Sequence, residues 1–145
     1  MIRGYRVWDN QEKTYSDKAF SIDQLGICYV QDEDGYWEEI DDSRFIVEFE
    51  TGLTDKNGKE IREGDIVEWV DGLWEKHIFE IMWNECRASF QMVEIGQEYP
   101  YILQGLSDKM KPYCEVIGNI HEPPKDFRPE HLKRMGVSIS KGGEE

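Results

Sequence analysis

The sequence predicts a mainly β protein, a small SH3-like β barrel or barrels built from antiparallel hairpins. Two of the three observations behind this prediction are residue pairs that favour tight turns, Asn57-Gly58 and Asp71-Gly72. The third is the stretch Gly64–Val70, in which a glycine bend leads into β-branched and aromatic residues. A turn, a glycine and then such a strand commonly open a small SH3-like barrel.

The segments before this centre are predicted to be strands joined by polar turns. Alternation places Phe45, Val47 and Phe49 on one face of the clearest of these strands. Gly35 is expected to supply the positive φ of the turn that precedes Tyr36. Short apolar segments within residues 14–22 fit either a helix or a strand. The expected strands of this part are Ile2–Trp8, Leu25–Val30, Tyr36–Ile40 and Arg44–Glu50.

Two hairpins are predicted in the centre of the chain. Asn57-Gly58 is expected to form a type I′ turn with both residues at positive φ, so that Phe49–Thr54 pairs with Lys59–Ile61. Asp71-Gly72 is expected to turn the next two strands antiparallel to each other. The expected strands of this part are Ile66–Val70, Trp74–Trp83, Ala88–Ile95, Tyr99–Leu103 and Glu115–Ile120.

The C-terminal segment predicts a short helix and a flexible tail. A proline at the start, an early acidic residue, late basic residues and a closing glycine favour a helix over Pro129–Gly136. The polar residues from Val137 onward predict disorder. A chain of 145 residues fits one β domain over 1–125, or two subdomains of about 1–50 and 51–125, followed by the helix and tail in 126–145.

Three motifs in order along the chain carry a family resemblance. They are Arg6-Val7-Trp8-Asp9, the run TGLTDKNGKEIREGDIV at Thr51–Val67, and EVIGNIHE at Glu115–Glu122. Together they resemble the signature of the YopX family of phage and prophage proteins. The resemblance implies a small β-rich fold over 1–125, a bacteriophage or prophage origin, and no established biochemical role. Its motif positions are candidate interaction residues, namely Arg6, Trp8, Asp9, Asn57, Gly58, Gly64, Asp65, Trp69, Gly118 and Asn119.

The charge of the chain is strongly acidic and unevenly distributed. The formal net charge is −14, and residues 1–72 carry 19 acidic side chains against eight basic ones. The stretch Asp32–Glu50 alone holds nine acidic residues and one basic residue, Arg44. Such a surface repels phosphate backbones, so direct binding to nucleic acid is not expected.

The apolar segments and the cysteines of the sequence indicate the cellular compartment of the protein. No run approaches the roughly 20 apolar residues of a membrane helix, and the N-terminus lacks the apolar region of a signal peptide. Cys28, Cys86 and Cys114 are odd in number and form no C-x-x-C pair, which favours free thiols in a reducing compartment. These features predict a protein of the host bacterial cytoplasm without membrane contact.

Known catalytic and ligand-binding motifs are not found in the sequence. Asp55, Asn57 and Gly58 are similar to part of a calcium loop, but Leu53 and Gly64 occupy its first and last ligand positions. The three histidines have no zinc-binding spacing. Signatures of an activated nucleophile or of a phosphate-binding loop are missing as well. The sequence therefore predicts no catalytic residue, no metal and no cofactor.

The sequence is compatible with three functions. The favoured one is a non-enzymatic interaction module that binds a host or phage protein or associates with itself through strand edges. The alternatives are an acidic decoy that offers Asp32–Glu50 to a host DNA-processing protein, and a metal-dependent phosphodiesterase whose acidic residues meet only in the fold. Five aromatic residues are further candidates. Core packing is the favoured prediction for any one of them, but one or two of the five are expected to line a binding groove. The five are Tyr36, Trp37, Trp69, Trp74 and Trp83.

Overall fold

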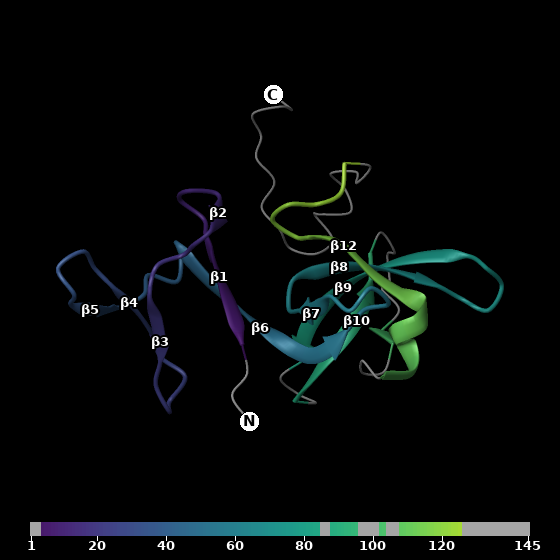
Figure 1. Cartoon of the computed structure of the whole chain (residues 1–145), viewed down its shortest axis with the longest axis horizontal. Helices are drawn as coiled ribbons and strands as arrows, with labels where there is room; N and C mark the ends of the chain where they lie inside the picture. The colour runs from purple at the N-terminus through teal and green to yellow at the C-terminus, as the bar shows by residue number, and fades with distance from the viewer. Residues whose placement is uncertain (1–3, 85–87, 96–101, 104–107, 126–145) are drawn as a thin grey trace. The chain divides into compact units, whose positions relative to one another are not determined.

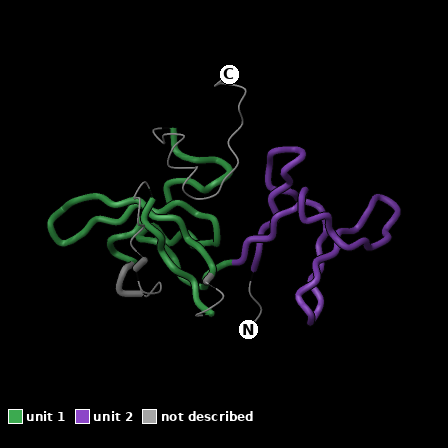
Figure 2. The backbone as a smooth tube through the Cα atoms, turned by 180° about the vertical axis from the view of Figure 1, so that it is seen from behind, with its two compact units in different colours: residues 1–3, 50–145 green, residues 4–49 purple. Residues whose placement is uncertain are grey.

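The computed structural model describes residues 4–84, 88–95, 102–103 and 108–125. The chain divides into two compact units, one over residues 4–49 and the other from residue 50 onward (Figure 2). The boundary falls inside one long strand, Phe45–Thr54. Within the described ranges, no helix is both long enough and apolar enough to cross a membrane.

The first unit contains antiparallel strands around an aromatic core (Figure 1). Strand β1 lies between β2 and the first half of β6, and β4 lies between β3 and β5. Trp8 packs edge-on against Tyr15, and Phe20 meets Phe45 in the same way, with ring centroids 5.0 and 5.5 Å apart. The strands are β1 (Tyr5–Asp9), β2 (Thr14–Tyr15), β3 (Phe20–Ile22), β4 (Cys28–Gln31), β5 (Trp37–Glu39) and β6 (Phe45–Thr54).

The second unit is built on a five-stranded antiparallel sheet in the order β11-β10-β9-β8-β12. Figure 1 shows this sheet curled into a half-barrel, with the hairpin of β8 and β9 extending beyond the other strands of the unit. Its elements are β7 (Glu60–Arg62), β8 (Asp65–Val70), β9 (Lys76–Asn84), β10 (Ser89–Glu94), β11 (Ile102–Leu103), the 3-10 helix η1 (Asp108–Tyr113) and β12 (Cys114–Asn119). The buried core is Ile61, Val67, Phe79, Ile81, Met92 and Cys114.

The structure confirms the mainly β class and the antiparallel hairpins. Each strand expected from the sequence overlaps an observed strand, and the segment 14–22 forms the two short strands β2 and β3. The hairpin predicted at Asp71 is present, with Val67 opposite Phe79 and Trp69 opposite His77. The predicted helix Pro129–Gly136 and the tail lie outside the described residues.

The turn geometry predicted at Asn57-Gly58 is wrong. Only Gly58 has a positive φ, +81°, so the turn is not of type I′. The Asp55 amide donates to the Lys59 carbonyl at 2.8 Å, which closes a longer loop. The Asp55 carboxylate accepts hydrogen bonds from amides inside that loop, and this stabilises a conformation that needs a positive φ only near its end.

The turn predicted at Asp71-Gly72 joins β8 to β9 as expected. Its residue at positive φ is Trp74, at +65°, and not Gly72. As at Asp55, the first residue of the loop is an aspartate whose carboxylate accepts amides of the loop, in this case from Leu73 and Glu75. The hydrogen bonds to the aspartate, and not the position of the glycine, therefore determine which residue of the turn has a positive φ.

Gly118 marks a β-bulge in strand β12, where the pairing with β8 shifts between Val116 and Gly118. The chain after the strand folds back on this glycine. A Cβ atom here would lie 2.8 Å from Cδ of Pro124 and 3.1 Å from the carbonyl oxygen of Glu122. The glycine is required because a rigid proline ring and a backbone oxygen fill the space of a side chain.

We expect Gly118→Ala to lower the free energy of unfolding by about 1–3 kcal/mol, because either the backbone or Pro124 must move. Urea unfolding followed by tryptophan fluorescence measures the change. Gly72→Ala is the matched control, since a Cβ at Gly72 meets no atom within 4 Å. Equal effects of the two substitutions would contradict the steric explanation.

Candidate functional site

The candidate residues Arg6 and Trp8 hold the first unit together. Arg6 Nε donates to Glu48 Oε1 at 2.8 Å, and the Tyr15 hydroxyl donates to the same oxygen at 3.0 Å. The Arg6 guanidinium also lies over the Tyr15 ring, 4.5 Å from its centroid. Trp8 is buried beside them. Both residues therefore join β1 to its neighbouring strands and are not presented to a partner.

Asp9 is a buried carboxylate at the end of β1. Arg44 donates to it twice, from Nε to Oδ1 at 3.0 Å and from Nη2 to Oδ2 at 2.9 Å. The amides of Gln11 and Glu12 donate to Oδ1 as well. The hydrogen bonds from Arg44 lower the pKa of Asp9, burial opposes them, and with the two amides the pKa falls to about 2. Asp9 is thus a structural anion at neutral pH.

Asn57 and Gly58 belong to a turn that is tied to strand β12 through Asp55. The buried Asp55 accepts hydrogen bonds from the amides of Asn57 and Lys59 on Oδ1 and from the amide of Val116 on Oδ2, each at 2.9 Å. Burial raises the pKa of Asp55, but these amides lower it further, so it lies below its ordinary value. From the sequence, Asn57 and Gly58 are candidate residues and Asp55 is considered only as a calcium ligand, whereas in the structure Asp55 makes the contact that fixes them.

The remaining candidates also serve the second unit internally. Gly64, at φ +86°, donates to Ile81 and accepts from the amide of Ile120, both at 2.9 Å. Asp65 is 1% exposed and accepts the amide of Arg62 at 2.8 Å.

Trp69 and Asn119 also make contacts within the second unit. The half-buried Trp69 packs against His77 and Phe79, with ring centroids 5.7 and 6.0 Å apart. Asn119 Oδ1 accepts the amides of His121 and Glu122, which turns the chain after β12. Together with the bulge glycine Gly118, all ten candidates make contacts within the fold, and their role in binding a partner stays a prediction.

One five-residue turn, which we call the Asp-capped turn, occurs four times in the described parts of the chain. The aspartate Oδ1 accepts the amides of the third and fifth residues at 2.8–3.0 Å. The aspartate amide donates to the carbonyl of the fifth residue, and the amide of the fourth residue donates to the aspartate carbonyl. The four turns are residues 23–27, 32–36, 55–59 and 71–75.

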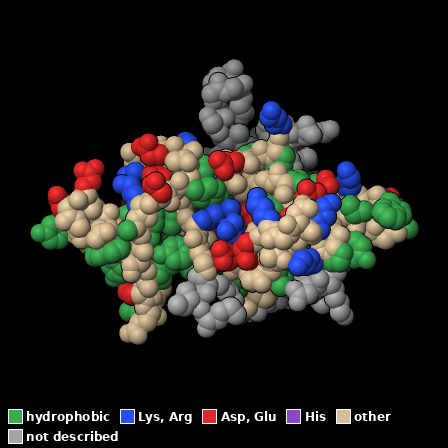
Figure 3. Space-filling view, viewed as in Figure 1, with side chains coloured by type: hydrophobic (Ala, Val, Ile, Leu, Met, Phe, Trp, Pro, Cys, Tyr) green, Lys and Arg blue, Asp and Glu red, His purple; other side chains and the backbone are tan. Residues whose placement is uncertain are grey.

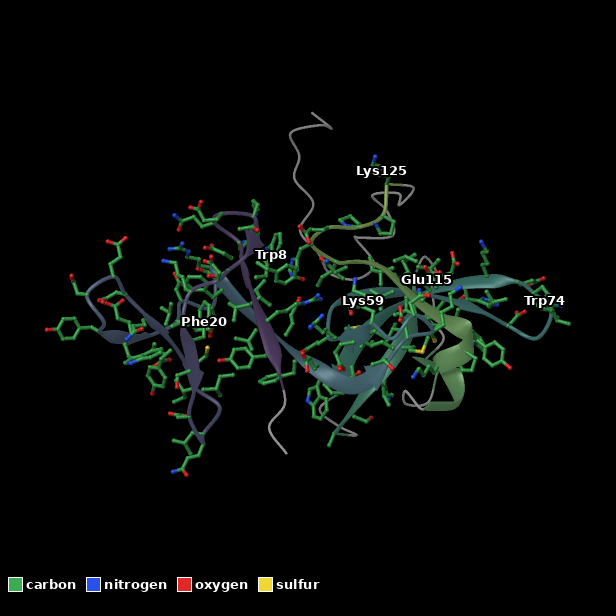
Figure 4. All side chains as sticks on the ribbon, in the orientation of Figure 1. Trp8, Phe20, Lys59, Trp74, Glu115 and Lys125 are labelled. Atoms are coloured by element: carbon green, nitrogen blue, oxygen red, sulfur yellow. The ribbon has the colours of Figure 1, made fainter. Side chains whose placement is uncertain are left out.

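Three of the Asp-capped turns present large apolar side chains to solvent. Leu25 is 80% exposed, Tyr36 70%, Leu73 79% and Trp74 87%. Trp37 and Trp83 are exposed by 48% and 39%, whereas Trp69 is half-buried. Core packing is the favoured prediction for each of the five aromatic residues, and it is wrong for the four exposed ones, Tyr36, Trp37, Trp74 and Trp83. Figure 4 places Trp74 at the far end of the β8–β9 hairpin.

His77 is held between two carboxylates beside the turn of that hairpin. Its Nε2 lies 2.7 Å from Asp71 Oδ2 and its Nδ1 lies 3.1 Å from Glu94 Oε2. Both neighbours are carboxylates, so a protonated imidazole can donate to each of them from its two ring nitrogens. The bond to Asp71 and then that to Glu94 raise the pKa of His77 above 6.5, and the bond from His77 lowers the pKa of Asp71.

Asp71 and His77, together with Glu75, form a group in the described chain that could hold a metal ion. Ligand atoms of Asp71, Glu75 and His77 lie within 4.8 Å of one another, and zinc accepts such nitrogen and oxygen ligands. An ion bound to His77 Nε2 would have to replace the proton that now joins this nitrogen to Asp71. The signal available in the sequence was the spacing of Asp71, Glu75 and His77, which lie in the turn and at the start of β9. Glu94, which also contacts His77, comes from β10 and could be placed only by the sheet pairing.

A cavity of about 450 Å³ lies in the first unit. Its walls include Ile40, Phe45 and Val47, and Glu39 and Asp42 also line it. The thiol of Cys28 lines it too, but burial and the charge of Asp42 raise its pKa, so it stays protonated and is not an activated nucleophile.

We expect Asp9→Asn to lower the free energy of unfolding at about pH 7 by about 2 kcal/mol, since one pKa unit corresponds to about 1.4 kcal/mol. A lowered pKa stabilises the fold above the ordinary value of 3.8, and this contribution disappears as the pH falls toward about 2. The difference between variant and parent should therefore shrink on acidification, as urea unfolding at about pH 7 and about pH 2.5 can test. The exposed Asp17→Asn serves as control.

The raised pKa of His77 predicts the opposite pH dependence. Its ion pairs stabilise the fold fully below 6.5, and their contribution is lost as the pH rises through the higher pKa of the folded state. The urea midpoint should fall between about pH 6 and about pH 9 in the parent and change less in His77→Gln. Parallel curves for the two proteins would contradict this assignment.

The comparisons with known proteins agree with this fold. The family model described as YopX protein matches residues 4–127. A search of proteins with curated descriptions found no match. The crystal structure of protein EF1440 from Enterococcus faecalis is similar, with 23% sequence identity, a TM-score of 0.50, and coverage of 86% of this chain and 97% of that one.

The crystal structure of protein YopX from Bacillus subtilis is similar too. The identity is 19%, the TM-score is 0.54, and the alignment covers 86% of this chain and 97% of that chain. At such identities the two structures support the fold alone, whereas the family model spans most of the chain, including every motif quoted from the sequence. The chain belongs to the YopX protein family.

Proposed function

We propose that this protein is a non-enzymatic interaction module of bacteriophage or prophage origin, acting in the cytoplasm of the host bacterium. Its curled second unit serves as an SH3-like barrel that holds the β8–β9 hairpin in place. The three sequence motifs of the family support the phage origin. The binding role is supported by the distribution of side chains described below.

The observation that carries this proposal is the exposure of large apolar side chains at the ends of rigid turns. Leu25, Tyr36, Leu73 and Trp74 are each at least 70% exposed, and each stands in an Asp-capped turn. The space-filling view shows hydrophobic atoms at the end of the β8–β9 hairpin (Figure 3). Aromatic anchors on rigid backbone are typical of protein-binding surfaces, because little entropy is lost when they bind.

The polar residues support the same proposal. Carboxylates that a catalytic site would need are used inside the fold, as with Asp9 on Arg44 and Glu48 on Arg6. The net charge of −14 opposes nucleic acid as a direct partner. Self-association through the edge strand β5 is disfavoured by its exposed Glu38 and Glu39, so a different protein is the preferred partner.

An acidic decoy is the second candidate function. Seven of the nine acidic residues in Asp32–Glu50 are exposed, while Glu48 is buried and Glu50 is half-buried against Arg62. Asp32 and Asp41 accept amides within their own turns, so their carboxylates also have a structural role. The carboxylates available to a partner without such a role are Glu33, Asp34, Glu38, Glu39 and Asp42.

One experiment separates the two candidates. The immobilised protein is exposed to lysates of Bacillus subtilis and Enterococcus faecalis, retained proteins are identified by mass spectrometry, and light scattering after gel filtration gives the oligomeric state. A matched variant carries Glu33→Gln, Glu38→Gln, Glu39→Gln and Asp42→Asn, which leave the turn caps intact. We expect the parent and the variant to retain the same proteins.

Two results would overturn these functions. A strict monomer that retains no protein contradicts the interaction module. Retention of a DNA-processing protein by the parent, and not by the amide variant, favours the acidic decoy, because the four substitutions change charge and little else.

A further inference from the structure

Trp74 stands where the other Asp-capped turns have glycine. The fourth residue of this turn has a positive φ in all four copies, +87° at Gly26, +91° at Gly35, +81° at Gly58 and +65° at Trp74. A bulky side chain rarely adopts this left-handed conformation, because its Cβ crowds the backbone. The fourth copy therefore carries a strained tryptophan where a glycine would be relaxed.

The glycine of this turn does not relieve the strain. Gly72 is the second residue of the turn, has no positive φ, and would accept a Cβ without any contact within 4 Å. Nor does packing within the described chain compensate, since the Trp74 side chain is 87% exposed. A residue that is both strained and exposed stabilises nothing in the free protein, and backbone strain of this kind collects at functional positions.

The surroundings of Trp74 define the chemistry of its partner. Leu73, 79% exposed, adds a second apolar side chain at the tip. The charged groups next to the tip are the carboxylates of Asp71 and Glu75 and the ammonium group of Lys76. Asp71 is paired with His77 and Lys76 with Glu68, so the carboxylates of Glu68, Asp71 and Glu75 outnumber the basic groups. An apolar tip bordered by carboxylates is complementary to an apolar pocket with a rim of lysine or arginine.

We infer that Trp74, together with Leu73, is the anchor with which the protein docks on another protein, the indole entering an apolar pocket whose rim is basic. The inference rests on the proposed interaction function and specifies its surface. Anionic membranes and nucleic acids offer negative charge, so the carboxylates at Asp71 and Glu75 select against them. The turn holds the indole in place before binding, which reduces the entropy lost on association.

The first test is stability. We expect Trp74→Gly to raise the urea midpoint of unfolding, because glycine adopts the left-handed conformation without strain. The matched inverse is Gly58→Trp, in the same position of a turn where a Cβ meets no atom within 4 Å, and it should lower the midpoint. A lower midpoint for Trp74→Gly would overturn the inference, since the tryptophan would then stabilise the fold.

The second test is binding. Full-length protein with the photo-cross-linking amino acid p-benzoylphenylalanine at position 74 is irradiated in lysates of Bacillus subtilis and Enterococcus faecalis, with the same amino acid at position 36, in another turn, as the comparison. We expect cross-links from position 74 to a protein whose linked peptides combine apolar residues with lysine or arginine. Unlabelled parent protein should compete for this cross-link, and Trp74→Gly should compete at least about tenfold more weakly.

The outcomes separate this inference from the proposed function. Equal competition by Trp74→Gly, or cross-links from position 74 only to a second copy of the chain, to nucleic acid or to lipid, would overturn the anchor. Protein cross-links from position 36 alone would overturn the anchor and leave the interaction function standing. A monomer without protein cross-links from either position would contradict both.

Discussion

Asp55 accepts three backbone hydrogen bonds with one buried carboxylate, two from its own turn and one from Val116, 61 residues further along the chain. An ionised group that is 1% exposed must keep such partners, because an uncompensated buried charge is strongly unfavourable. This single side chain therefore fixes the shape of a turn and the position of strand β12 beside it. Lys56, from the same turn, reinforces this link, because its Nζ lies 3.2 Å from Oε1 of Glu115 in the strand.

Carboxylates with such partners explain how a chain of net charge −14 folds. Asp9 and Glu48 are buried against Arg44 and Arg6, and Asp71 is paired with His77. In each case hydrogen bonds or an ion pair lower the free energy of the charged form inside the fold. These carboxylates are thus part of the scaffold, although the sequence alone would place them on the surface.

The division of roles between polar and apolar residues supports the functional proposal. The motif residues that identify the family bind one another and the backbone, whereas Leu73 and Trp74 meet solvent at the end of a hairpin. The family signature therefore marks the scaffold, and the surface that differs from it is the place to seek a partner. The ion pairs of His77 add a pH-dependent stabilisation beside the turn of the same hairpin.

The sequence by itself determined the β class, the places of the turns and the positive φ of Gly35, because local sterics and the two-residue period of a strand decide these features. Only the tertiary structure decided which charges pair, since Arg6 and Glu48 are 42 residues apart and meet through the register of two strands. It also decided that Trp74 takes the strained position of its turn. Asp71 sets that position through hydrogen bonds to the loop amides, and these override the preference of Gly72.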